Sequence, residues 1–404
     1  MGTLKNLGSF RAVSDSASDT PTEHERHDLT TDLAFCEEVL PRVSRTFALS
    51  IATLPESLRE IVRVSYLLCR IVDTVEDDAR VEWRVRSSLF DEFDALMGDD
   101  ARLPKGFESE CVAVALGDVS AADHELATRA GAVFRVFRAQ PAELRAAVRP
   151  HILEMSRGMR EYAARAAREG RLRIADMADL ERYCYFVAGT VGKLLTALFE
   201  RVVPSMSAHA LAETRARAVS FGLALQMVNI VKDVAEDHAR GDCFLPLDRA
   251  EAHGVSLDEL LAPERRDAAL AVVGDVCAQA RVNLRRAREY TALWPAREGR
   301  DVRLFCAVPL ALALATLHEV EHGGDALRAD VKPKVSREVV WRAFADVQLA
   351  VGDDTHLRWM FGYYGSGMFD DAACEAQGAA APVVAPPPRP SSRGLSPSRL
   401  RASD

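Results

Sequence analysis

The sequence predicts an all-α protein with a single helical domain. Apolar residues recur at helical spacing, as at positions 61, 64, 67, 68, 71 and 72. No segment shows strand-like alternation bounded by turn signals, and glycine and proline fall mostly between the periodic segments. We expect helices over about 32–55, 56–80, 82–98, 120–138, 141–168, 176–203, 208–239, 256–293, 298–321 and 335–361.

The two ends of the chain differ in composition from this helical region. Residues 1–27 are rich in Ser, Thr, Asp and charge, which predicts a disordered N-terminal segment. Residues 375–404 form a Pro/Ala/Arg-rich tail with six prolines after Gly378, and that density excludes a helix. No linker interrupts residues 28–370, so we expect one domain there.

Composition narrows the class of protein. The net charge of −9 argues against nucleic acid as a partner, although bound metal ions would still allow an anionic small substrate. Eight cysteines without a CxxC pair indicate a reducing compartment and no zinc site. The longest apolar stretch, 305–317, is shorter than the roughly 20 residues that span a bilayer. We expect a cytoplasmic monomer, with peripheral membrane contact as an alternative.

Two acidic clusters, each at the end of an apolar segment, are the main chemical feature. Asp73, Glu76 and Asp77 share one helix face at i, i+3 and i+4, where like charges repel unless a cation binds. Asn229, Asp233 and Asp237 are spaced one helical turn apart. One cluster alone fits a solvated acidic face equally well. Two favour magnesium, which prefers carboxylates together with substrate phosphates.

Such clusters at the mouth of an apolar cavity suit an isoprenoid diphosphate. The hydrocarbon chain enters the dry cavity, and magnesium bridges the diphosphate to the acids and stabilises it as a leaving group. Arg45 and Arg70 are candidates for contacting the departing diphosphate. For each, the competing interpretation is an ordinary surface or ion-paired arginine.

Several motifs resemble the squalene/phytoene synthase family, in the family order over roughly residues 35–250. They are Ser44-Arg45-Thr46-Phe47, Tyr66 with Arg70 and the first acidic cluster, the run Tyr183-Cys184-Tyr185-Phe186-Val187-Ala188-Gly189, and Gln226 with the second cluster. Phe305-Cys306-Ala307-Val308-Pro309 and Val331-Lys332-Pro333-Lys334 are similar to the squalene synthase branch. The resemblance implies the isoprenoid synthase fold, one helical domain around a central cavity.

It also implies a role for each matching residue. The magnesium-diphosphate ligands would be Asp73, Glu76, Asp77, Asp233 and Asp237. The catalytic residues would be Tyr183, which assists proton removal and stabilises cations, with Arg70 and Lys232 on phosphate oxygens. Substrate would contact Arg45, Phe47, Tyr66, Gln226, Asn229, Phe305, Cys306 and Pro309. Lys332 and Lys334 would lie in a basic loop near NADPH.

The implied reaction joins two farnesyl diphosphates head to head into presqualene diphosphate, which NADPH then reduces to squalene. Lys232 stands where arginine is more frequent in the family, and Asp242 stands where a basic residue is common. Val335 and Ser336 interrupt the run of charged residues in the basic loop. These departures concern mostly the reductive half. A related synthase that ends at presqualene diphosphate, hydroxysqualene, dehydrosqualene or phytoene remains an alternative, as does a non-catalytic assembly or binding protein.

Overall fold

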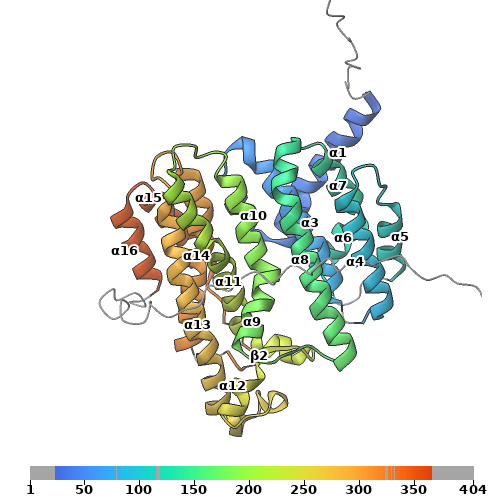
Figure 1. Cartoon of the computed structure of the whole chain (residues 1–404). Helices are drawn as coiled ribbons and strands as arrows, with labels where there is room; N and C mark the ends of the chain where they lie inside the picture. The colour runs from blue at the N-terminus through green and yellow to red at the C-terminus, as the bar shows by residue number, and fades with distance from the viewer. Residues whose placement is uncertain are drawn as a thin grey trace, which may run out of the picture.

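The computed structural model describes residues 23–365, apart from 79, 115–118, 324–325, 329 and 332. The first helix begins at Glu23, inside the segment expected to be disordered, and residues 1–22 lie outside the described part, as does the tail 375–404. The described chain is almost entirely helical (Figure 1), which confirms the predicted all-α class.

The first half of the chain forms helices of mixed length around one end of the molecule (Figure 1). These are α1 (Glu23–Val43), α2 (Arg45–Ala52), α3 (Glu56–Asp77), α4 (Trp83–Gly98), α5 (Lys105–Ala113), α6 (Ala121–Thr128), α7 (Ala130–Arg138) and α8 (Ala142–Glu169). The expected helix 32–55 is divided because Ser44 is extended and its hydroxyl accepts from the Phe47 N–H as an N-cap.

The second half of the chain includes several long helices. In chain order its helical elements are α9 (Met177–Cys184), a π-helical segment (Tyr185–Gly189), α10 (Thr190–Phe199), α11 (Ala208–Ala239), α12 (Leu247–Ala252), α13 (Arg266–Leu293), α14 (Arg300–His322), α15 (Arg337–Ala350) and α16 (Asp354–Tyr364). Helix α11 is the longest of the described helices, and α13 and α14 are also long. Short 3-10 turns cover Leu257–Glu259 and Pro263–Arg265. Helix α11 packs against α10, α13 and α14 and is the centre of the domain.

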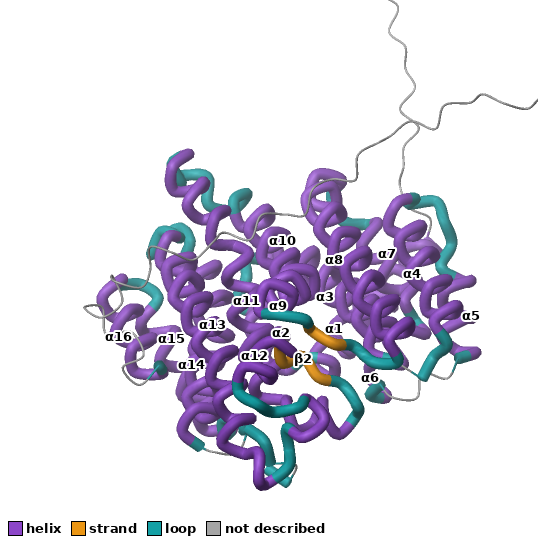
Figure 2. Tube along the Cα trace, turned by 60° about the horizontal axis from the view of Figure 1, so that its bottom comes forward, coloured by secondary structure: helices purple, strands orange, loops and turns teal. Residues whose placement is uncertain are grey.

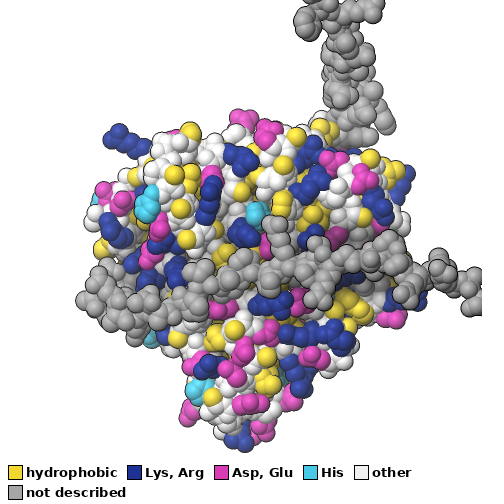
Figure 3. All heavy atoms as spheres, in the orientation of Figure 1, with side chains coloured by type: hydrophobic (Ala, Val, Ile, Leu, Met, Phe, Trp, Pro, Cys, Tyr) yellow, Lys and Arg dark blue, Asp and Glu magenta, His cyan; other side chains and the backbone are white. Residues whose placement is uncertain are grey.

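Helices α11 and α14 are long and apolar enough to span a membrane by length and composition. Buried residues make up 67% and 78% of their respective apolar windows. A helix that is apolar on all sides and enclosed by other helices is typical of a protein core. On the face in Figure 3, basic and acidic side chains are interspersed among the coloured atoms, so the net negative charge is not gathered into one patch there.

Two very short strands were not predicted. β1 (Arg173–Ile174) pairs in parallel with β2 (Cys243–Pro246), and Figure 2 shows them in orange against an otherwise helical tube. A strand of two to four residues is too short to produce an alternating pattern that a sequence could reveal. The pair fixes the segment after α11 beside the segment that leads into α9.

Close backbone contact joins α10 and the π-helical segment to α11. A Cβ on Gly192 would lie 2.1 Å from the Ala218 carbonyl oxygen, and a Cβ on Gly222 would lie 2.2 Å from the Ala188 carbonyl oxygen. Only glycine fits at such a distance. Helix α11, which carries the second acidic cluster, is therefore held close to α10 and to the π-helical segment.

Candidate active site

Both acidic clusters line one polar cavity of about 650 Å³ at the C-terminal ends of α3 and α11. The first cluster contributes Asp73 and Asp77, and the second contributes Asp233 and Asp237. Residues more than 150 positions apart in the chain thus meet at one mouth. This is the arrangement that the sequence predicted from two helices that each end in acids.

The first cluster has the donor set of a cation site. Carboxylate oxygens of Asp73, Glu76 and Asp77 lie within 4.8 Å of one another. Glu76 does not line the polar cavity itself, and its Oε2 atom is buried without a hydrogen-bond partner. An orphaned buried carboxylate oxygen is costly unless a cation or a donor satisfies it. The residues present therefore fit magnesium, whose preferred ligands are hard oxygens.

Crowding and loss of hydration raise the pKa values of these acids. Loss of hydration among its neighbours, followed by the charge of Asp73, raises the pKa of Asp77 to about 8, although this residue is exposed at the mouth. Burial raises the pKa of Asp237 to about 7, with Asp233 and Asp242 adding to the effect. Carboxyls with raised pKa values are those whose ionised form needs a compensating positive charge. A divalent cation supplies that charge directly.

Basic side chains flank the acids of the second cluster. The Lys232 ammonium lies 2.9 Å from Asp233, and the Arg240 guanidinium lies 2.6 Å from Asp237. Lys232, Arg240 and Asp242 all line the polar cavity. The mouth therefore offers cations for phosphate oxygens beside carboxylates for metal, which is the mixture that a metal-bound diphosphate requires.

Arg70 is fixed by a residue that the sequence did not reveal. Its guanidinium donates to both oxygens of Asp123, at 2.8 and 3.1 Å, and also forms an ion pair with Asp73. Asp123 is only 5% exposed and also accepts from the Ser120 hydroxyl at 2.6 Å. A bidentate carboxylate sets the plane of a guanidinium. Asp123 therefore orients Arg70 toward the mouth.

Tyr183 lies at the inner side of the mouth and is buried. Its ring stacks on Phe244 of β2 at a centroid distance of 5.1 Å and meets Tyr162 edge-on at 5.1 Å. Burial, with the charges of Glu76 and Asp77, raises the pKa of Tyr183 well above its ordinary value. The phenol is therefore neutral, and the strand pair that seats Phe244 holds it in place.

A second, apolar cavity of about 250 Å³ continues inward from the polar one. The two share Arg70, Asp73, Gln226 and Asn229 in their linings. The inner walls carry Phe47, stacked on Tyr66 at 5.2 Å and 6.5 Å from Phe305. Other apolar walls come from α8, α10, α11 and the π-helical segment: Met155, Val187, Ala188, Val191, Leu195, Phe221 and Leu225.

Comparison with known proteins identifies the family. The squalene/phytoene synthase family matches residues 40–342, which is most of the chain. The chain belongs to the squalene/phytoene synthase family. The polar mouth and the apolar cavity both lie within the matched region.

Curated squalene synthases are relatives of the chain. The enzyme of Schizosaccharomyces pombe is 28% identical, covering 80% of this chain and 67% of its own length, and that of Rattus norvegicus is 26% identical, covering 78% and 70%. A squalene synthase of Candida albicans is 27% identical over 74% of this chain and 64% of its own length. The chain thus spans about two thirds of the length of these relatives.

Solved structures of the family confirm the isoprenoid synthase fold. TcSQS in complex with the ligand BPH1237 superposes with a TM-score of 0.69 and 26% identity, covering 84% of this chain and 91% of the other. A dehydrosqualene synthase in complex with a ligand superposes with a TM-score of 0.56 at 22% identity, covering 80% and 98%. The second likeness concerns the fold alone.

Some predicted site residues lie away from both cavities. Arg45 is the exposed first residue of α2, and Cys306 and Pro309 are buried in α14 outside both linings. Cys306 directly follows Phe305 and therefore points to another side of the helix, whereas Pro309 lies one turn further along the same face. Lys334 is exposed and also outside both linings, and Lys332 lies outside the described residues.

Proposed function

We propose that the protein is a magnesium-dependent prenyltransferase that joins two farnesyl diphosphates head to head into presqualene diphosphate and then reduces it to squalene with NADPH. One observation carries the proposal: two acidic clusters share a polar mouth, lined also by Tyr183, that opens onto an aromatic-lined apolar cavity. The names of the relatives in the family support the same reaction.

The two regions of the site divide the work of binding. Asp73, Glu76 and Asp77 on one side, with Asp233 and Asp237 on the other, would hold the magnesium ions. Magnesium, when bound, neutralises the diphosphate and stabilises it as it leaves. Arg70 and Lys232 would bind free phosphate oxygens, and the aromatic walls would exclude water from the allylic cation.

Tyr183 is placed to stabilise a cation and to transfer a proton. The stacked rings of Tyr183 and Phe244 present π-faces at the mouth, where the cation forms. As the cyclopropane closes, a carbon loses its proton to the phenol oxygen while the phenol proton passes to an oxygen of the released diphosphate. The phenol is then restored unchanged, in accord with its raised pKa.

The reductive half-reaction draws its support from the names of the relatives. We propose that NADPH reacts at the same cavity and that Lys332 and Lys334 contact its phosphates. Lys334 is exposed, as a residue that meets a phosphate from solvent must be. The related thirty-carbon products, hydroxysqualene and dehydrosqualene, would need the same mouth and cavity and differ in how the final cation is quenched, whereas phytoene would also need two longer, twenty-carbon substrates.

Product analysis tests the proposal. The purified protein is incubated with farnesyl diphosphate and magnesium, with and without NADPH, and the products are identified by mass spectrometry. We expect presqualene diphosphate without NADPH and squalene with it. Hydroxysqualene or dehydrosqualene formed regardless of NADPH would refute the reductive half. No turnover by a folded preparation would refute the synthase and favour a binding role.

We further propose that contact with a membrane runs through α15 and α16. Four of the six exposed large apolar side chains in the described residues lie there: Trp341, Leu349, Trp359 and Tyr363. Trp359 stacks on Tyr363 at 5.8 Å, and such aromatic side chains favour the lipid–water interface. Phosphatidylcholine vesicles should bind the protein, and a Trp341→Ala/Trp359→Ala variant should release it. Equal sedimentation of both with vesicles would contradict this.

A further inference from the structure

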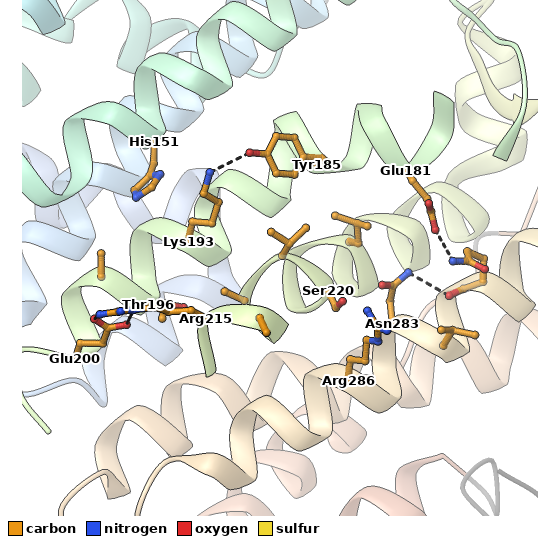
Figure 4. A pocket seen from close by; sticks show the side chains of 17 residues that line it. His151, Glu181, Tyr185, Lys193, Thr196, Glu200, Arg215, Ser220, Asn283 and Arg286 are labelled. Carbon is orange, nitrogen blue, oxygen red and sulfur yellow. Dashed lines mark hydrogen bonds and ion pairs between the residues drawn. The ribbon is translucent and has the colours of Figure 1, made fainter. Parts of the chain in front are cut away.

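A separate cavity of about 450 Å³ lies behind the active site, among α8, α9, α10, α11 and α13 (Figure 4). It uses the opposite faces of the same helices. On α10, Val191 and Leu195 line the apolar active-site cavity, whereas Lys193 and Thr196 line this one. The active-site chemistry assigned above uses none of its lining residues. Its volume is that of ordinary small-molecule sites, roughly 300–1,000 Å³.

Two deeply buried polar side chains in this cavity have unused hydrogen-bonding capacity. Ser220 of α11 is 6% exposed, and its hydroxyl has no partner among the described residues. Asn283 of α13 is 4% exposed; its amide nitrogen donates to the Gln279 carbonyl at 3.2 Å, while its Oδ1 atom accepts from no described residue. Figure 4 shows both near the middle of the cavity. Buried polar groups of this kind normally have a partner.

Several charged groups around the cavity are paired within the protein. Arg286, which also lines the cavity, lies near Glu181, and its charge opposes the rise that burial causes in the pKa of that carboxyl. Lys193 lies 2.9 Å from Glu154, which also accepts from the Tyr185 hydroxyl at 2.6 Å. The Arg215 Nε atom lies 2.6 Å from Glu200. Glu181 accepts from the Gln279 amide, as the dashed line in Figure 4 marks. An ionic ligand would have to displace one of these pairs, so the cavity suits a neutral molecule.

Much of the remaining lining is apolar. Val219 and Leu223 of α11, Val282 of α13 and the small side chains Ala197 and Ala216 provide it. Burial also lowers the pKa of His151, with the Lys193 charge adding to the effect, so its imidazole is neutral at physiological pH. The cavity therefore combines an apolar wall with a few buried polar atoms, the Ser220 hydroxyl, Asn283 Oδ1 and His151 Nδ1, the pattern of a site that orients a ligand through its polar group.

We propose that this cavity binds a neutral amphiphile, an apolar chain or ring that carries one hydroxyl group. The ligand hydroxyl would donate to Asn283 Oδ1 and accept from the Ser220 hydroxyl. A hydroxyl also serves if the Asn283 amide is turned over, because it both donates and accepts. The site is distinct from the farnesyl diphosphate site and does not depend on the reaction proposed for it.

Binding of a simple alcohol tests the proposal. The full-length protein is titrated calorimetrically with 1-octanol, with 1-chlorooctane as a chain without a hydroxyl, and with octanoate as an anion. We expect 1-octanol to bind and the other two to bind at least several-fold more weakly. The Ser220→Ala variant should weaken 1-octanol roughly 2- to 12-fold, the value of one hydrogen bond.

Two further variants locate the binding. Ala216 is exposed at the cavity rim, so Ala216→Trp fills the cavity without disturbing the core and should abolish binding. Val191→Phe narrows the active-site cavity instead and should leave 1-octanol binding intact. Equal binding to wild type and Ala216→Trp would overturn the proposal, as would loss only in Val191→Phe, equal affinity for 1-chlorooctane, or no binding of 1-octanol by the folded protein.

Discussion

Replacing Asp123 with asparagine should separate the orientation of Arg70 from its charge. In the structure the Arg70 guanidinium is shared between Asp123, through two hydrogen bonds, and Asp73 of the first acidic cluster. The substituted asparagine would keep the shape of the side chain but lose the negative charge. Arg70 should then pair fully with Asp73 and withdraw that carboxylate from magnesium.

The geometry sets the size of the expected loss of stability and of the expected change in magnesium dependence. Removing one partner of a fully buried ion pair costs about 3–5 kcal/mol. Because the Arg70 side chain is 30% exposed and the asparagine oxygen still accepts, we expect a smaller loss, about 1.5–3 kcal/mol in the free energy of unfolding. For function, we expect the magnesium concentration for half-maximal rate to rise roughly 10-fold, which corresponds to about 1.4 kcal/mol.

The assay is the initial rate of condensation against magnesium concentration, together with chemical unfolding of the same preparations. Asp32→Asn is the matched control, because Asp32 is also 5% exposed and binds Arg135 through two hydrogen bonds, at 2.6 and 2.8 Å, outside both active-site cavities. It should lower stability and leave the magnesium dependence unchanged. A wild-type magnesium dependence in Asp123→Asn, or the same shift in Asp32→Asn, would refute the reasoning.

Three further predictions concern the acids, the helix contact and the tyrosine. Because the pKa values of Asp77 (about 8) and Asp237 (about 7) are raised, both hold protons that magnesium must displace, so thermal stabilisation by magnesium with pyrophosphate should grow from pH 6 to 8.5; a pH-independent shift would contradict this. Gly192→Ala should unfold at a lower denaturant concentration than wild type. Gly274→Ala on α13, where an added Cβ has no neighbour within 4 Å, should raise the free energy of unfolding by about 0.5–1 kcal/mol. Tyr183→Phe should lower turnover by at least 10² with diphosphate binding retained, and normal steady-state rates would remove Tyr183 from catalysis.

The sequence predicted those parts of the fold that rest on long-range periodicity. Residues 56–80 and 208–239 were expected as helices and form α3 and α11, because apolar segments of this length are too long for a strand. The breaks inside other predicted helices depend on single side chains, such as the Asp353 cap that begins α16. The π-helical segment could not be predicted, since a single π-helical turn leaves no periodic pattern in five residues.

The site could be predicted where its chemically active residues lie close together in the sequence. Asp73 and Asp77 are one turn apart, so their shared face follows from helix geometry alone. Asp123 was missed because it is an acid near the start of a short helix, a position that acids occupy for capping alone. Its bond to Arg70 joins residues 53 positions apart and exists only after α6 packs on α3.

The packing of α11 explains why catalysis and a second ligand site can share one framework. Its C-terminal acids face the mouth, Gln226 and Leu225 face the apolar cavity, and Ser220 faces the cavity behind. Glycine contacts bring the backbones of α10 and the π-helical segment into close contact with α11. A ligand wedged behind them would therefore strain the same contacts that set the width of the active-site cavity, since packed interfaces transmit strain rather than absorb it.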